Sequence, residues 1–139
     1  MFVLDTNVVS ELRKAKSGKA DAGVIEWARG VQANALFLSA ITLLELESGV
    51  LQIERRDASQ GALLRTWFDQ HVIPGFSGRI LAVDTAVALR CARLHVPDPR
   101  AERDALIAAT ALVHGMTVVT RNVEDFAPTG VALINPWTS

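Results

Sequence analysis

The sequence contains a single cysteine, Cys91, so no disulfide can form within the chain. This absence excludes the disulfide-stapled scaffolds of small secreted proteins and favours a reducing cytoplasm. We expect Cys91 to be a core residue, because apolar residues such as Ala88 and Ala92 surround it at helical spacing.

Long hydrophobic runs and an excess of one charge are also missing. No apolar run approaches the roughly 18 to 20 residues that a membrane span needs. The N-terminus lacks the basic and then apolar pattern of a signal peptide, so we expect a cytoplasmic protein. A net charge of −1 argues against binding duplex nucleic acid over a wide face. It does not exclude an enzyme in which a metal ion neutralises phosphate locally.

Apolar residues, by contrast, are abundant: they make up 50% of the chain, and its mean hydropathy is +0.25. This richness favours a sheet covered on both faces, or a subunit that buries further surface against a partner. Strands and helices alternate, which predicts right-handed βαβ units, a mainly parallel sheet and one α/β domain. The expected strands are Phe2–Leu4, Leu36–Leu38, Ile80–Val83, Met116–Thr120 and Val131–Ile134.

Helical patterns fill the segments between these strands. The expected helices are Asn7–Lys14, Gly23–Val31, Ala40–Arg55, Ala58–Val72, a helix from its cap Asp84 to about His95, and Ala101–His114. Thr6 or Asn7 is expected to cap the first helix and Ser39 the third. The polar segment Lys14–Ala22 is expected to be a loop.

Polar residues follow three of the strands. Asp5-Thr6-Asn7 come after the first strand, Ser39 after the second, and Thr120-Arg121-Asn122 after the strand near residue 118. In open parallel sheets, function gathers beyond the carboxyl ends of the strands. For Asp5 by itself, a helix cap is the simpler interpretation.

Other acids are expected at the same edge. Glu45 shares a helix face with Thr42 and Gly49. A glycine inside a helix costs about 1 kcal/mol relative to alanine, so Gly49 suggests that something approaches closely beside the carboxylate. Glu47 is expected to be a solvated acid. Asp104 opens a helix that is apolar nearly all round, where a first-turn acid also suits the helix dipole.

Asn122 and Asp125 lie just past a strand, and an ordinary turn residue and surface acid would also fit there. Acids gathered at one edge repel one another unless a cation lies among them. Oxygen ligands without cysteine or histidine favour Mg²⁺ or Mn²⁺ over zinc. His71, His95 and His114 show no metal-ligand spacing. Such a cation with open positions suits phosphodiester hydrolysis.

Four segments together resemble a known family: "FVLDTNVVSEL", "LSAITLLELESGV", "RDALIAATALVHGMTVVTRNVEDF" and "GVALINPW". The chain resembles the PIN-domain ribonucleases, and most closely the VapC-type toxins of toxin–antitoxin systems in their FitB-like branch. The resemblance spans essentially the whole chain. It implies a single PIN domain over residues 1–139, with a three-layer α/β/α fold and a central, mainly parallel sheet of four to five short strands.

The resemblance also implies roles for individual residues. Asp5, Glu45 and Asp104 match the family's metal-binding and catalytic acids. The fourth family position, often aspartate, is Asn122 here, and Asp125 could supply its charge directly or through a metal-bound water. Small polar residues that orient the acids or contact substrate would be Thr6, Asn7, Thr120 and Arg121.

The implied activity is that of an Mg²⁺- or Mn²⁺-dependent endoribonuclease that leaves a 5′-phosphate and a 3′-hydroxyl. Asp5 or Asp104 would accept a proton from the attacking water. The implied partners are RNA, a second copy in a homodimer, and an antitoxin that inserts into the groove and carries the complex to promoter DNA. The basic residues expected to flank the site are Arg13, Lys14, Lys16, Arg100, Arg103 and Arg121.

Three other classes of protein remain as alternatives. A response-regulator receiver needs an acidic pair after the first strand and a lysine after a later one, but Thr120-Arg121 stands at that later strand. A haloacid-dehalogenase-type phosphatase needs a second acid where Asn7 stands. A PIN-like fold that has lost activity and serves as a binding module is the strongest alternative, supported by the departure at Asn122.

Overall fold

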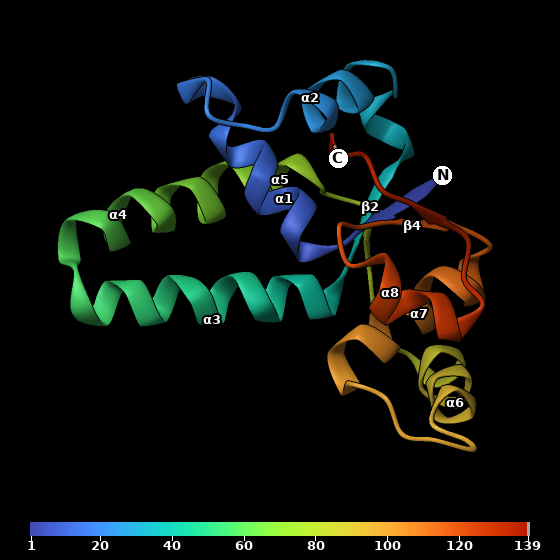
Figure 1. Cartoon of the computed structure of the whole chain (residues 1–139). Coiled ribbons are helices and arrows are strands. Elements are labelled where there is room, and N and C mark those ends of the chain that lie inside the picture. The colour runs from blue at the N-terminus through green and yellow to red at the C-terminus, as the bar shows by residue number, and fades with distance from the viewer. Residues whose placement is uncertain (139) are drawn as a thin grey trace.

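The computed structural model describes residues 1–138 and contains a five-stranded parallel sheet at its centre (Figure 1). The strand order is β3-β2-β1-β4-β5, and each neighbouring pair is parallel. The strands are β1 (Phe2–Leu4), β2 (Leu36–Ser39), β3 (Ile80–Leu81), β4 (Thr117–Val119) and β5 (Leu133–Ile134). The predicted parallel sheet is confirmed, and β1 lies in its middle.

Helices cover both faces of this sheet. They are α1 (Thr6–Arg13), α2 (Ala22–Arg29), α3 (Ala40–Arg56), α4 (Ala58–Trp67), α5 (Ile73–Gly75), α6 (Thr85–Leu94), α7 (Glu102–His114) and α8 (Val123–Phe126). Figure 1 shows α6 and α7 on one side, and α1 with the long α3 and α4 on the other. Within residues 1–138, no helix has the length and apolarity needed to span a membrane.

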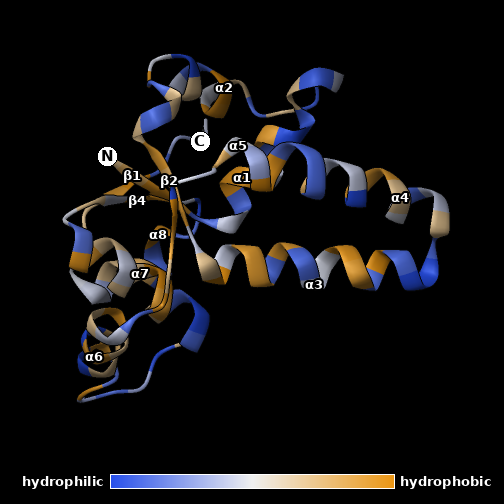
Figure 2. Ribbon diagram, turned by 180° about the vertical axis from the view of Figure 1, so that it is seen from behind, coloured by the Kyte–Doolittle hydropathy of each residue, from blue (hydrophilic) through white to orange (hydrophobic). Residues whose placement is uncertain are grey.

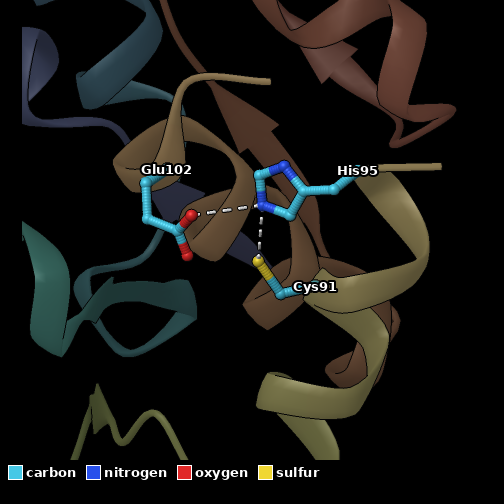
Figure 3. A group of neighbouring side chains, drawn as sticks. All are labelled: Cys91, His95 and Glu102. Atoms are coloured by element: carbon cyan, nitrogen blue, oxygen red, sulfur yellow. Dashed lines mark hydrogen bonds and ion pairs between the residues drawn. The ribbon is translucent and has the colours of Figure 1, made fainter. Parts of the chain in front are cut away.

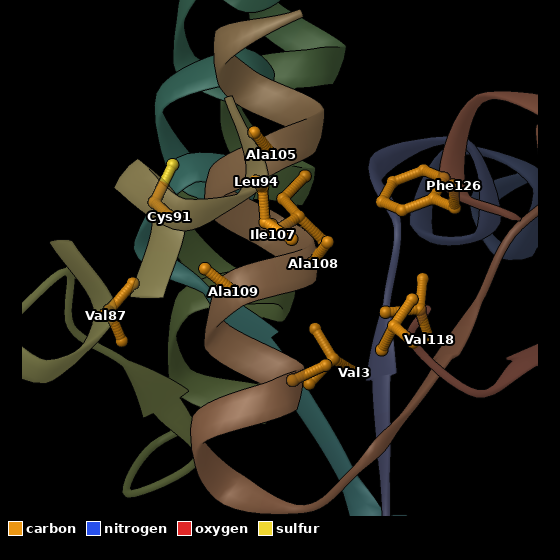
Figure 4. Close-up of a cluster of buried hydrophobic side chains, with 12 residues drawn as sticks. Val3, Val87, Cys91, Leu94, Ala105, Ile107, Ala108, Ala109, Val118 and Phe126 are labelled. Atoms are coloured by element: carbon orange, nitrogen blue, oxygen red, sulfur yellow. The ribbon is translucent and has the colours of Figure 1, made fainter. Parts of the chain in front are cut away.

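Two hydrophobic cores arise from the alternation of side chains along β1. Val3 packs with Ile107 and Phe126 on the α7 side (Figure 4), whereas Leu4 packs with Val8 and Phe68 on the α1 side. Successive strand residues point to opposite faces, so one short strand serves both cores. The apolar strands run through the middle of the molecule in Figure 2, with helices on either side. This confirms the predicted three-layer α/β/α arrangement.

Helices α3 and α4 run side by side as an arm that extends away from the sheet (Figures 1 and 2). The guanidinium of Arg65 on α4 binds Glu47 at 2.6 Å and Glu54 at 3.0 Å on α3. Glu47 keeps a partly exposed side chain, as predicted for a solvated acid, and in addition the hydrogen bonds from Arg65 lower its pKa. Gly61 permits the close approach, since a Cβ there would lie 2.5 Å from the Cα of Glu54.

Several element boundaries differ from the sequence-based predictions. Helix α1 is capped by Asp5, not by Thr6 or Asn7, because the Asp5 carboxylate accepts the backbone N–H of Thr6 at 2.8 Å. Part of the expected loop, Lys14–Ser17, is a 3₁₀ helix that continues α1. The helix predicted over 58–72 changes to π-helical geometry at Phe68–Val72. Ser39 and Asp84 are caps, as predicted.

Candidate metal centre

Asp5 lies at the carboxyl end of the central strand and is only 4% exposed. Its Oδ1 accepts the backbone N–H of Thr6, and its Oδ2 accepts the hydroxyl of Thr120 at 2.8 Å. Thr120 follows β4, which pairs with β1, so the parallel register brings the two residues together. The carboxylate is thereby held from two elements that lie 115 positions apart in sequence.

Glu45 reaches the same edge from the second turn of α3. Its Oε1 accepts the hydroxyl of Thr6 at 2.6 Å, and its Oε2 lies 3.9 Å from the guanidinium of Arg103. The Thr42 hydroxyl lies 3.3 Å from that of Thr6. Thr6 therefore links the two acids, since its backbone binds Asp5 and its side chain binds Glu45. The orienting role expected for Thr6 stays a prediction, for which these two contacts provide the geometry.

Burial and the repulsion between neighbouring acids both disfavour ionised carboxylates at this edge of the sheet. Burial, together with the smaller effects of the charges of Asp104 and Glu45, raises the pKa of Asp5 to about 6, although the hydrogen bonds from Thr120 and Thr6 lower it. Asp104, in the first turn of α7, also has a raised pKa, first because of burial and then because of Asp125 and Glu45. A bound cation would offset this repulsion.

One cleft of about 450 Å³ brings most of the predicted residues together. It is lined by Asp5, Thr6, Asn7, Ser10, Glu11, Glu45, Asp104, Arg121, Asn122 and Trp137. Asp125 lies in an adjoining hollow of about 310 Å³ that shares Asp104 with the cleft. Asn122 therefore lines the same cleft as the three acids, whereas Asp125 raises the pKa of Asp104 from the neighbouring hollow.

The loop after β4 is organised by hydrogen bonds with α1. Thr120 accepts the N–H of Asn122 at 2.9 Å while its hydroxyl donates to Asp5. The side-chain oxygen of Asn7 accepts the N–H of Arg121 at 3.4 Å. Asn7 and Thr120 thus position the loop as well as the acid, which extends their expected orienting role.

The donor set fits a hard divalent cation. Asp5, Glu45 and Asp104 offer carboxylate oxygens from three different elements to one polar cleft, and oxygen ligands are those that Mg²⁺ and Mn²⁺ prefer. Within residues 1–138, the ligand atoms of these three acids do not all come within 4.8 Å of one another. The acids therefore line an open cleft rather than a closed ligand cage.

Gly49 does not meet the close neighbour that its sequence context suggested. A Cβ at Gly49 would have no atom within 4 Å. The residue instead borders a hollow of about 240 Å³ that also contains Glu45, Leu46 and Trp67. The glycine leaves open space beside Glu45, and nothing in residues 1–138 fills it.

A second group of possible ligands lies at the junction of α6 and α7 (Figure 3). The Nε2 of His95 is 3.7 Å from the Cys91 sulfur and 3.4 Å from a Glu102 carboxylate oxygen. The prediction that no histidine has metal-ligand spacing was wrong for His95, because Cys91 and His95 lie one helical turn apart and α7 brings Glu102 to them.

Hydrogen bonding nevertheless argues against a metal ion on His95. Its Nδ1 accepts the backbone N–H of Arg100 at 3.1 Å, so in the neutral ring the proton resides on Nε2. That proton faces Glu102 and Cys91, and a metal ion on Nε2 would have to displace it. Burial also raises the pKa of the Cys91 thiol, which favours the protonated form. The group therefore joins α6 to α7, and Cys91 is a buried core residue as predicted.

Trp137, Ser10 and Glu11 line the cleft but were not among the predicted site residues. Ser10 and Glu11 lie on α1, one helical turn beyond Thr6 and Asn7, so helical spacing from the predicted residues would have found them. No local signal could have found Trp137, because the C-terminal tail reaches the cleft only through tertiary folding.

Comparisons with known proteins identify the family of the chain. Residues 2–130 match the PIN domain family model. The chain is 37% identical over 145 residues to the VapC ribonuclease Y4jK of Sinorhizobium fredii, covering 99% of this chain and 98% of the relative. It is 34% identical over 142 residues to toxin FitB of Neisseria gonorrhoeae, covering 99% of each.

Solved structures show the same relationship. The chain superposes on the crystal structure of FitAcB from Neisseria gonorrhoeae with a TM-score of 0.89, 34% identity and full coverage of both chains. A structure of FitAB bound to an IR36 DNA fragment gives the same TM-score and identity, covering 100% of this chain and 97% of the other. With the family model matching most of the chain and these relatives matching nearly all of it, the chain belongs to the PIN-domain family, among the VapC and FitB proteins.

Proposed function

We propose that this protein is a metal-dependent endoribonuclease that acts as the toxin of a toxin–antitoxin pair. The observation that carries the proposal is the cleft in which buried Asp5 meets Glu45 and Asp104, with the pKa of Asp5 raised to about 6. Relatives named VapC ribonuclease and toxin FitB support this assignment. We further propose that residues 1–139 function as one PIN domain; Ser139 lies outside the described residues.

Asp5, Glu45 and Asp104 would hold Mg²⁺ or Mn²⁺, which when bound lowers the pKa of a coordinated water and stabilises charge on the phosphate. Asp5 and Asp104 are the better acceptors for a proton from the attacking water. The pKa values of Asp5 and Asp104 are raised, which favours them as proton acceptors, and Glu45 lies beside the positive charge of Arg103. Attack in line with the leaving oxygen would leave a 5′-phosphate and a 3′-hydroxyl.

Basic residues near the cleft would contact the RNA backbone. Arg121 lines the cleft, Arg100 lines the adjoining hollow, and Arg103 lies beside Glu45. Arg13 lines the hollow on the other side of Glu45. Lys14 and Lys16 are less suited, because Lys14 pairs with Glu11 and Lys16 lines a hollow between α1 and α4.

An antitoxin segment would suit the hollow between α1, α3 and α4. Its walls include apolar Leu46, Val50 and Leu64, and it opens beside Glu45. A protein segment seated there would also block the carboxylate cleft, which shares Thr6, Ser10 and Glu45 with this hollow. The FitAB structure with DNA suggests that such a complex would reach promoter DNA through its antitoxin. A homodimer remains part of the proposal.

The proposal is tested with the purified protein freed of any antitoxin. Structured RNA would be incubated with the wild-type chain and with Asp5→Asn and Glu45→Gln, in Mn²⁺ or in EDTA. We expect cleavage by the wild type in Mn²⁺ and none in EDTA or with either variant. Cleavage that survives EDTA or both substitutions would rule out the metal mechanism.

The second candidate function is a catalytically inactive binding module. The observation that favours it is the amide of Asn122 in the cleft, where the family often has a fourth acid. Failure to cleave any RNA, together with normal growth of cells that express the protein, would support this alternative.

A further inference from the structure

The carboxylate cleft has one aromatic wall. Of the residues that line it, Trp137 alone has a large apolar side chain, and it is half-buried. The guanidinium carbon of Arg121 lies 5.5 Å from the centre of the Trp137 ring, a cation–π distance. The wall therefore combines a flat aromatic surface with a positive charge, beside Asp5 and Asn122.

The C-terminal tail is anchored so that Trp137 stays at this wall. The backbone N–H and the hydroxyl of Thr138 donate to the Asp21 carboxylate at 3.1 and 2.5 Å, and Asp21 caps α2. The backbone N–H of Trp137 donates to the side chain of Asn135 at 3.1 Å. Gly23 lets the tail pass, because a Cβ there would lie 2.5 Å from the carbonyl oxygen of Pro136.

The Arg121 guanidinium contacts only the Trp137 ring among the charged and aromatic partners of residues 1–138, and a base that stacks on that ring would take its place there. Among residues 1–138 the ion pairs involve other cations and not Arg121, and its residue is exposed. Its backbone is held by Asn7, so the side chain starts from a defined position at the cleft. A guanidinium placed this way can bind a phosphate while its neighbour Trp137 contacts a base.

We propose that Trp137 stacks on an unpaired RNA base next to the scissile phosphate, with Arg121 binding that nucleotide's phosphate. The inference rests on the proposed ribonuclease function and names the residue that would position the nucleotide at the cleft. Stacking on an aromatic ring requires a base that is free of its helix, and every base offers a face to stack. Trp137 is a positioning residue, since it lies beside the carboxylates that would perform the chemistry.

The composition of the two hollows favours RNA over a protein segment at this wall. The other residues of the cleft are polar or charged, whereas the hollow beyond Glu45 has Leu46, Val50, Ile53 and Leu64. A protein segment would bury apolar surface in that second hollow. A nucleotide, with one flat apolar base and charged phosphates, matches a single aromatic ring among polar groups.

The test measures binding separately from cleavage. Ca²⁺ replaces Mn²⁺, and fluorescence anisotropy follows a labelled unstructured RNA of about 12 nucleotides, within the usual single-strand site size. The same RNA annealed as a blunt duplex is a second probe. The third is a series in which one abasic nucleotide is moved along the strand. The protein variants are Trp137→Leu and Trp137→Phe, and Trp27→Leu is the matched control.

We expect Trp137→Leu to weaken single-strand binding about 5-fold to 150-fold, the range for losing one base stack. Trp137→Phe keeps an aromatic face and should retain most of the affinity. Trp27→Leu makes the same chemical change at a residue that packs on Phe2 and does not line the cleft, and should not alter binding. The duplex should bind more weakly, and Trp137→Leu should not change its affinity.

The abasic series should show a loss at one position for the wild type, with no further loss when Trp137→Leu is combined with it, because both changes remove the same contact. A flat abasic profile for the wild type would overturn the proposal even if Trp137→Leu failed to fold. Equal RNA affinity of a folded Trp137→Leu would also overturn it and assign the wall to packing or a protein partner. If the protein failed to cleave RNA in Mn²⁺, only the proposed function would be contradicted, because RNA binding is measured in Ca²⁺ and does not depend on cleavage.

Discussion

Asp5 performs two tasks with one side chain. One carboxylate oxygen caps α1 through the N–H of Thr6, and the other accepts the hydroxyl of Thr120. The sequence suggested that a helix cap and a cation ligand were competing interpretations of this residue. The structure shows the cap directly. The raised pKa of Asp5 means that its ionised form is disfavoured unless a cation lies nearby. The residue can therefore cap α1 and also bind a cation.

Replacing Asp5 with asparagine separates these tasks. Asparagine is as good an N-cap as aspartate, so the helix should keep its start. Loss of the charge should lower the cleavage rate at least about 100-fold, since even residues that only support metal ligands cost 10- to 100-fold. Thermal unfolding in EDTA should show the variant to be at least as stable as the wild type. A clear loss of stability would mean that the charge itself stabilises the fold.

The fourth position can be tested with a pair of substitutions. Asn122→Asp adds an acid that faces the cleft, whereas Asp125→Asn removes one from the adjoining hollow. We expect Asn122→Asp to tighten Mn²⁺ binding about 10-fold, within the range for changes around a metal site. Asp125→Asn should have a smaller effect and lower the pKa of Asp104. Calorimetric titration with Mn²⁺ measures the metal affinity of both variants. A larger effect of Asp125→Asn would assign the fourth role to Asp125.

At the scale of elements, the α3–α4 arm carries Glu45 on its inner end and holds itself together by close packing and the Arg65 ion pairs. Two glycines in this arm look alike in sequence but differ in surroundings. A Cβ at Gly49 would meet open space, whereas one at Gly61 would collide with the backbone of Glu54. Neither position needs the backbone freedom of glycine, since both residues lie within helices.

Alanine at these two positions should have opposite effects. Gly49→Ala should stabilise the protein by up to about 1 kcal/mol through helix propensity. Gly61→Ala should destabilise it by about 1 to 3 kcal/mol, because the two helices must separate. Urea unfolding measures both changes. If Gly49→Ala stabilises the fold but abolishes RNA cleavage or antitoxin inhibition, a partner needs the open space beside Glu45. Equal effects of the two variants on stability would contradict the difference in packing around the two glycines.

For the whole molecule, the carboxylate cleft links stability to pH and to metal. Asp5 has a pKa of about 6 in the folded protein and 3.8 as a free side chain, so the fold favours protonated Asp5. Its contribution to stability is fully present below about pH 4 and is lost as the pH rises through about 6. This rise in pKa corresponds to about 3 kcal/mol.

The expected result is that the metal-free wild type loses stability relative to Asp5→Asn between about pH 4 and 6. Taking the difference between the two proteins removes the opposite trend of acids whose pKa is lowered, such as Glu11 and Asp21. Adding Mn²⁺ at neutral pH should raise the melting temperature of the wild type and not of the variant. Parallel pH curves for the two proteins, or an equal metal effect, would contradict this account.

Sequence by itself determined the parallel sheet, the main helices and the three acids that line one cleft. Alternating apolar strands and helices specify βαβ units, and an acid directly after a buried strand has to emerge at the carboxyl edge. Motif spacing was enough to match Asp5, Glu45 and Asp104 to the family, although their metal-binding role remains a prediction.

Only the tertiary structure decided which polar groups meet. It joined Thr6 to Glu45 and Thr120 to Asp5, separated Asn122 from Asp125 into two hollows, and grouped Cys91, His95 and Glu102. It also carried Trp137 from the C-terminal tail to a cleft that begins at residue 5. The physical reason is that such contacts depend on strand register and helix docking across more than a hundred positions. Local propensity and spacing contain no information about those distances.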